Sequence, residues 1–215
     1  MKYFFILFFT FALIFSAKSQ HNEYRGWKNW NNFQVNYKIN KSTSVSGTLG
    51  LRSRHYFSTL DQGFINLDVT KELKHHSLSF AYRSILDNNR YAYSLRHRVN
   101  IDYGYSLKII KKHSLFFRYR IQQSFSYLNS KLTNRLRLKY IYKYDKKVKL
   151  FLFQESFLDR KKTANYFYKY RVGLGFNYKI KKKVKIEFKY FRSNEINIYS
   201  PKSYNILGIA LKKKI

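Results

Sequence analysis

Residues 91–103 read YAYSLRHRVNIDY, and the stretch alternates between two kinds of side chain along its whole length. The odd-numbered positions, from Tyr91 to Tyr103, are mostly apolar or aromatic, and the even-numbered positions between them are mostly polar or charged. A period of two residues indicates a β-strand with one apolar and one polar face. Strands of soluble proteins average about five or six residues, whereas a tilted strand needs about nine to eleven to cross a bilayer. The stretch therefore predicts a strand long enough to span a membrane.

The same alternation recurs along the chain, with no break in composition that would mark a second domain. The stretches that carry it are 28–39, 42–55, 63–70, 76–83, 91–107, 114–122, 131–144, 148–156, 166–180, 184–193 and 204–213. The connections between them alternate in length. Short ones lie near 40–41, 71–75, 111–113, 145–147 and 181–183, and longer ones near 56–62, 84–90, 123–130, 157–165 and 194–203.

Alternating short turns and longer loops are typical of bacterial outer-membrane barrels, whose short turns face the periplasm. We therefore predict an all-β, antiparallel transmembrane β-barrel with longer outer loops and a periplasmic C-terminus. Such barrels have an even number of strands, and eleven would leave the mature N-terminus at the opposite rim. We expect twelve, with residues 21–27 as part of another strand, or ten as the alternative. A soluble sandwich is disfavoured by the strand lengths and the aromatic placement.

The N-terminus fits a secretory signal peptide over residues 1–19. Lys2 is basic, an apolar run follows, and Ala17-Lys18-Ser19 has small residues at the spacing of a cleavage site. The alternative is an N-terminal anchor, for which the apolar run is short. Residues 20–215 would then form the barrel, located in the outer membrane. The chain has no cysteine, which excludes a lipoprotein anchor, disulfides and thiolate metal sites.

The chain is strongly basic, with 43 Lys and Arg against 11 Asp and Glu and a formal net charge of +32. Such a balance often indicates nucleic-acid binding. Here the export signal and the placement of the charges, which alternate with apolar residues at strand spacing, argue against it. The lysine runs 111–112, 146–147, 181–183 and 212–214 cluster at the predicted periplasmic rim. They either attract anionic headgroups or simply keep the turns soluble.

The apolar stripe is predicted to face lipid, with tyrosines near the strand ends as interfacial girdles. In 166–180 it comprises Tyr168, Tyr170, Val172, Leu174, Phe176, Tyr178 and Ile180. In 148–156 both faces are apolar, with Leu150 and Leu152 on one and Phe151 and Phe153 on the other. We place Glu155 inward, and Phe151 and Phe153 with it. Gly173 and Gly175 then lie on the inward side, where they give room or allow bending.

The opposite face would line the lumen, and it is rich in arginine. Its basic candidates are Arg52, Arg54, Arg83, Arg96, Arg98, Arg118, Arg120, Arg135, Arg137 and Arg171. Its acidic candidates are Asp68, Asp102, Glu155 and Glu187. Buried charges need partners, so two readings stay open. Either arginines and carboxylates form a structural network in a wet lumen, or the lumen receives an anion. Rings of arginine confer anion selectivity on pores.

Signals for catalysis are weak, and we expect neither an enzyme nor a cofactor or metal. Outer-membrane lipid enzymes can pair a serine with a histidine, and His55 with Ser53 or Ser58 is the local candidate. The adjacent His75 and His76 would point to opposite faces of a strand and could not share a metal.

Several short motifs resemble one known family. They are Trp27-Lys28-Asn29-Trp30 with the alternation to Tyr37, the inward Arg52 and Arg54, residues 154–157 (QESF), and residues 170–176 (YRVGLGF). On these motifs the mature chain resembles the domain of unknown function 2490 family, predicted outer-membrane barrels. The resemblance implies a porin-like barrel location, and it brings no activity because the family has none assigned.

We therefore expect an outer-membrane barrel, either structural or a narrow channel whose lumen favours anions. The alternatives are an outer-membrane lipid-modifying enzyme and a soluble periplasmic β-protein that binds an anionic polymer. The expected partners are outer-membrane lipids and the barrel-assembly and periplasmic chaperone machinery, with small anionic solutes as a further candidate and no nucleic acid.

Overall fold

The computed structural model describes residues 24–54, 58–88, 92–127, 129–160 and 165–215, which form eleven β-strands. These are β1 (Tyr24–Lys38), β2 (Thr43–Arg54), β3 (Thr59–Leu73), β4 (His76–Asn88), β5 (Tyr93–Ile110), β6 (His113–Ser126), β7 (Ser130–Lys143), β8 (Val148–Arg160), β9 (Asn165–Lys181), β10 (Val184–Glu195) and β11 (Lys202–Lys214). In these ranges no helix is both long and apolar enough to cross a membrane. The predicted signal peptide, residues 1–19, lies outside the described residues.

The strands close into a single barrel in which each strand pairs with its neighbours in sequence. Ten of the pairs are antiparallel, whereas β1 and β11 pair in parallel, from Tyr24 opposite Lys202 to Asn36 opposite Lys214. An odd ring cannot alternate in direction throughout, so one parallel pair is unavoidable. The predicted count of twelve strands, or ten, is therefore wrong. Residues 24–27 begin β1 instead of contributing to another strand, and the closed ring excludes the sandwich.

The two rims of the barrel carry different connections. At one rim lie the turns 39–42, 74–75, 111–112, 144–147 and 182–183 together with the C-terminus. There the backbone N–H of Ile215 donates to the carbonyl of Asn36 at 2.9 Å. We call this end the short-turn rim and the opposite end the loop rim. Because β1 and β11 are parallel, β1 begins at the loop rim.

The strands continue further toward the loop rim than the alternation predicted. The connections there are 55–58, 89–92, 127–129, 161–164 and 196–201, so the rims differ in connection length less than expected. In the turn 144–147, Oδ1 of Asp145 accepts hydrogen bonds from the backbone N–H groups of Val148 and Lys147, each at 2.6 Å. These bonds hold the pKa of the Asp145 carboxyl below its ordinary value.

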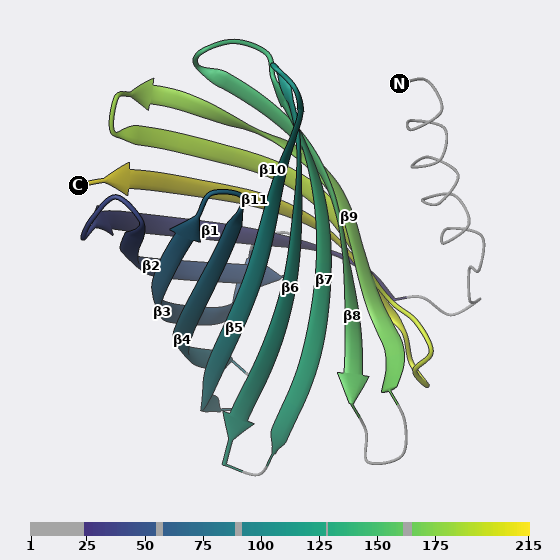
Figure 1. The fold of residues 1–215 in the computed structure, drawn as a ribbon. Coiled ribbons are helices and arrows are strands. Elements are labelled where there is room, and N and C mark those ends of the chain that lie inside the picture. The colour runs from purple at the N-terminus through teal and green to yellow at the C-terminus, as the bar shows by residue number, and fades with distance from the viewer. Residues whose placement is uncertain (1–23, 55–57, 89–91, 128, 161–164) are drawn as a thin grey trace.

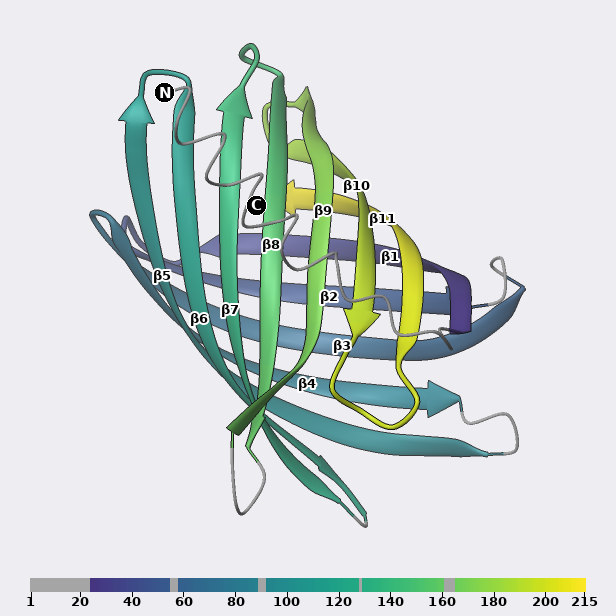
Figure 2. The same ribbon diagram turned by 90° about the vertical axis from the view of Figure 1, so that its right-hand side faces the viewer.

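The barrel wall is strongly twisted, as expected of a closed sheet whose strands tilt against the axis. Figure 1 shows β1 and β2 lying across the direction of the upright β6 to β9. In Figure 2, β1 to β4 run across the view behind the upright β6 to β9. The inward side chains of the two halves therefore meet in the lumen between them.

Outward positions along the wall are apolar and exposed, as at Leu49 and Leu51 on β2 and at Ile65 and Leu67 on β3. Inward positions hold the buried residues. A hydrophobic cluster in the interior comprises Phe151, Phe153, Phe191 and Ile206, with Trp30 packed against it. The edge of the Trp30 ring meets Phe191 with the ring centroids 5.0 Å apart. This contact joins β1 to β10 inside the barrel, beside the parallel β1–β11 pair.

One residue predicted to face outward does not. Tyr168 packs against the buried Phe157, with centroids 6.2 Å apart, and lines the lumen. The cause is an irregularity in the pairing of β8 with β9, where Phe157 opposes Lys169 but Leu158 opposes Phe167. The irregularity leaves Tyr168 out of step with the alternation of β9.

Two inward glycines of β9 make room for the phenylalanine cluster. A Cβ atom added at Gly173 would lie 2.3 Å from Cβ of Phe191 and 2.5 Å from the backbone oxygen of Tyr190. A Cβ at Gly175 would lie 2.3 Å from the backbone oxygen of Phe188. Because backbone atoms cannot move aside as a flexible side chain can, both positions require glycine.

We expect Gly173→Ala to destabilise the barrel by about 1–3 kcal/mol, the usual cost of overpacking. Gly47→Ala is the matched control, because a Cβ at Gly47 meets no atom within 4 Å. The temperature at which the folded band is lost on a gel should fall for the first variant only. Equal behaviour of the two variants would contradict this account of the close packing at Gly173.

Candidate functional site: the arginine-lined lumen

The lumen contains a cavity of about 720 Å³ whose described lining is dominated by arginine. Nine of the ten arginines predicted to face inward line it: Arg52, Arg83, Arg96, Arg98, Arg118, Arg120, Arg135, Arg137 and Arg171. The tenth, Arg54, lies near the loop rim, 3.5 Å from Asp61. The cavity lining also includes four lysines and two glutamates.

The centre of the arginine cluster is Glu155 on β8, whose side chain is fully buried. Four arginines from three strands surround its carboxylate. Arg118 and Arg135 each lie 2.9 Å from Oε1, and Arg137 at 3.1 Å and Arg171 at 3.5 Å approach Oε2. A buried carboxylate with several charged donors is strongly held, and each donor bond is stronger than a neutral one. Glu155 thus ties β8 to β6, β7 and β9 through the lumen.

The other predicted acidic residues lie on the same inward face. Asp102 accepts two hydrogen bonds from Arg120 in a bidentate pair and lies 3.6 Å from Arg118. Asp68 accepts a hydrogen bond from the hydroxyl of Thr70 at 2.8 Å. Glu187 pairs with Lys212 at 2.8 Å. The carboxylates are therefore committed to contacts with the protein itself.

Aromatic rings hold several of the lumen cations. The guanidinium of Arg52 lies 4.0 Å from the centroid of the Trp30 ring, and that of Arg171 lies 4.6 Å from Phe157. Nζ of Lys139 lies 3.7 Å from the centroid of Phe151. A cation over a ring face gains about 0.5–2 kcal/mol. The inward phenylalanines of β8 therefore stabilise charge as well as filling space.

Sequence reasoning missed four carboxylates that pair with inward cations. Asp61, Asp87, Asp159 and Glu195 fall in stretches that we predicted to be loops or loop edges. In the structure they lie within strands, and Asp87 binds Arg96 while Asp159 binds Lys131. The signal was present at Asp87 and Asp159, since each continues the inward alternation of its strand.

Lys212, which we predicted to belong to a lysine run at the short-turn rim, points into the lumen. Lys212 lines the cavity and donates to Glu187, whereas Lys213 and Lys214 are exposed. The position follows from the period of two on β11, where Ala210 and Lys212 lie on the inward face.

The lumen keeps an excess of positive charge after its ion pairs are formed. Along the cavity, nine arginines and four lysines face two glutamates, and the further paired carboxylates are Asp87, Asp102, Glu155 and Asp159. For the residues that line this cavity and their ion-pair partners, thirteen cations against six carboxylates leave an excess of seven positive charges. A medium in the lumen must offset that excess, either water with counter-ions or a bound anion.

The sequence also suggested a Ser–His pair and showed no histidines at metal-ligand spacing. His55 lies outside the described residues, between Ser53 on β2 and Ser58 before β3. Within the described ranges, no group of three His, Asp or Glu could hold a metal ion. His76 and His113 instead form hydrogen bonds with Tyr103 and Tyr140 on the outside of the wall.

Comparison with known proteins identifies the family. A family model described as a protein of unknown function, DUF2490, matches residues 27–199. The chain belongs to the DUF2490 family. The resemblance inferred from its motifs is thereby confirmed, and the matched segment contains the whole Glu155 cluster.

No curated protein matches this DUF2490 chain. A solved structure described as outer-membrane expressed OmpT of Vibrio cholerae is similar over 71% of this chain and 54% of that chain. The sequence identity is 13% and the TM-score is 0.41. The DUF2490 chain thus spans about half the length of that protein.

We expect Glu155→Gln to destabilise the DUF2490 barrel by about 3–5 kcal/mol, because four arginines would lose their shared carboxylate. Glu72→Gln removes the same charge from an exposed position on β3 and is the control. The heat-dependent mobility shift on a gel measures both. If Glu155→Gln and Glu72→Gln lose the folded band at the same temperature, the buried cluster is not what stabilises the barrel.

Proposed function

We propose that this chain is an outer-membrane β-barrel whose lumen favours small anions. The observation that carries the proposal is the excess of positive charge along the lumen cavity, where guanidinium groups outnumber the carboxylates that could neutralise them. Clefts lined by one sign of charge raise the local concentration of counter-ions. Arginine rings serve anion selectivity in pores.

The outer wall supports placement in a bilayer. Exposed large apolar side chains occur on all eleven strands, and a soluble monomer rarely exposes a patch of more than a few hundred Å². The closed ring pairs the backbone of every strand with a neighbour on both sides, as a lipid environment demands. The two properties together favour a membrane barrel over a soluble protein that binds a polymer.

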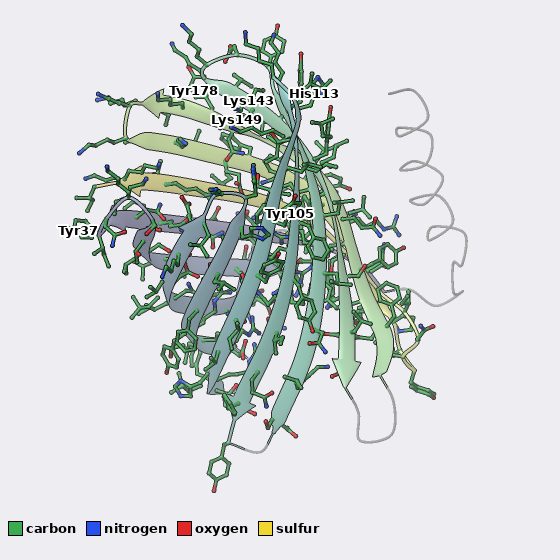
Figure 3. All side chains as sticks on the ribbon, viewed as in Figure 1. Tyr37, Tyr105, His113, Lys143, Lys149 and Tyr178 are labelled. Carbon is green, nitrogen blue, oxygen red and sulfur yellow. The ribbon has the colours of Figure 1, made fainter. Side chains whose placement is uncertain are left out.

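The short-turn rim supports an interfacial position for that end. Figure 3 labels Tyr37, Tyr105, His113, Lys143, Lys149 and Tyr178 there, on six different strands. Amphipathic rings favour the boundary between lipid and water, and basic side chains beside it attract anionic headgroups. Short turns face the periplasm in bacterial barrels, so we place this rim and the C-terminus in the periplasm.

Membrane placement and orientation can be tested with single cysteines, because the native chain contains none. In intact cells, we expect a membrane-impermeant maleimide to label Ser200→Cys in the loop 196–201 and to spare Lys146→Cys in the turn 144–147. Permeabilised cells should label both. Labelling of Lys146→Cys alone in intact cells would reverse the orientation, and release of the protein without detergent would overturn the membrane assignment.

The anion preference can be tested by the reversal potential of the reconstituted barrel across a KCl gradient. We expect chloride selectivity in the native protein. Arg96→Gln should reduce it, because Arg96 lines the cavity and its removal exposes the negative charge of Asp87. Lys146→Gln removes the same charge from an exposed turn and should have no effect. A lack of ion current, or cation selectivity that Arg96→Gln leaves unchanged, would overturn the proposal.

A further inference from the structure

Three pairs of arginines face each other directly across neighbouring strands inside the lumen. Arg83 opposes Arg98 between β4 and β5. Between β6 and β7, Arg118 opposes Arg137, and Arg120 opposes Arg135. Like charges directly opposite each other are destabilising unless something offsets their repulsion. Each pair therefore needs a negative group close to its two guanidinium groups.

In two of the pairs, carboxylates of the protein offset the repulsion. Glu155 binds Arg118 and Arg137 together, at 2.9 and 3.1 Å, and so bridges that pair. It also binds Arg135, whose partner Arg120 is held by Asp102. Each of these four arginines thus has a carboxylate within ion-pair distance.

The Arg83–Arg98 pair differs, since neither residue has a carboxylate within 4.0 Å in the part of the chain that is described. Nε of Arg83 donates to Oδ1 of Asn66 at 3.1 Å, and Nε of Arg98 donates to Oγ of Ser124 at 3.2 Å. Both acceptors are neutral and leave the charges uncompensated. The terminal guanidinium nitrogens make no hydrogen bond to the described residues, and both side chains line the cavity.

A third arginine joins this pair through a shared aromatic ring. Phe64 lies beneath Arg83 at 4.1 Å and beneath Arg52 at 5.1 Å, measured from the ring centroid to Cζ. The ring packs directly on the backbone of Gly50, where a Cβ would come within 2.1 Å of it. The ring therefore holds Arg52 and Arg83 on the same side of the lumen.

Arg52 likewise has no carboxylate partner among the described residues. It donates to the amide oxygen of Gln62 at 2.5 Å, and its buried Nε has no hydrogen-bond partner there. Arg52, Arg83 and Arg98 consequently form a second cluster, which resembles that around Glu155 but has no carboxylate at its centre. We call these three residues the open cluster.

We propose that the open cluster binds a doubly charged tetrahedral oxyanion, of the class of inorganic phosphate, between Arg83 and Arg98, as the Glu155 carboxylate lies between Arg118 and Arg137. Guanidinium groups present planar pairs of donors that match phosphate oxygens, and three of them offset a dianion. The site rests on the proposed function, because the anion must reach the lumen. It adds to general anion preference a saturable site for one class of anion.

The experiment follows the loss of the folded band with temperature in detergent, at increasing phosphate and constant ionic strength maintained with KCl. A ligand that binds only the folded state raises its stability in a saturable manner. We expect such a rise for the native protein, and an apparent phosphate affinity at least about tenfold weaker in Arg83→Gln and in Arg98→Gln. Glycerol phosphate, tested in parallel, distinguishes a site for phosphate esters from one for the free ion.

The matched control is the double variant Lys131→Gln with Asp159→Asn, which replaces a paired cation of the same cavity and keeps the net charge. It should retain the phosphate effect. Should the single variants fail to fold, Trp30 reports on the native site, since Arg52 lies 4.0 Å from its ring. In a Trp27→Phe background, Trp30 is the remaining tryptophan, and its fluorescence should change saturably with phosphate but not with chloride.

The outcomes separate this site from the proposed function. Chloride-selective current with no saturable phosphate effect would overturn the site and leave the anion-favouring lumen in place. Saturable phosphate binding without any ion current would support the site and remove the channel. A phosphate effect of equal size in the native protein, Arg83→Gln and Arg98→Gln would place the binding elsewhere and overturn the proposal.

Discussion

The interior of this barrel depends on one buried carboxylate. Glu155 is fully enclosed and binds arginines from β6, β7 and β9. Without it, four guanidinium groups would face one another in a region with little water, where unpaired charge is expensive. The phenylalanines that flank it on β8 add ring faces for Arg137 and Arg171. Together these contacts allow a wall of arginine to surround a lumen without forcing the barrel apart.

The same principle explains why the lumen is unevenly neutralised. From β5 to β9, Asp102 and Glu155 pair with the opposed arginines. On β4 the carboxylate of Asp87 pairs with Arg96, but the arginines of the open cluster contact neutral partners, namely Asn66, Gln62 and Ser124. Part of the arginine wall is thus paired with carboxylates, and the open cluster presents its charge to the lumen. A structural network and an anion-binding lumen, which were alternatives on the sequence, can therefore coexist in different parts of one interior.

The closure of the barrel places a second constraint on the molecule. Because β1 pairs in parallel with β11, the chain enters β1 at the loop rim and leaves β11 at the short-turn rim. Trp30 packs inward on Phe191, and the ring centroids of Trp27 and Tyr190 lie 6.2 Å apart. The WKNW motif on β1 thus contacts β10, on the far side of the β11 strand that closes the ring. The even strand count that we expected reflects a rule for purely antiparallel rings, which this ring is not.

The sequence by itself located the eleven stretches that form strands, though not the number of strands in the ring, and it indicated the direction of most side chains and the family. A period of two is a local property of the sequence, so the alternation around Arg96 or Leu174 can be recognised without knowing which strands lie beside it. Glu155 could be placed inward with Phe151 and Phe153 for the same reason. The sequence could not predict the strand count of the closed ring or the inward position of Tyr168, since pairing and register are set by neighbouring strands. Which arginines are neutralised, and which form the open cluster, was likewise decided only by the tertiary structure, because an ion pair joins residues that are distant in sequence and close across the lumen.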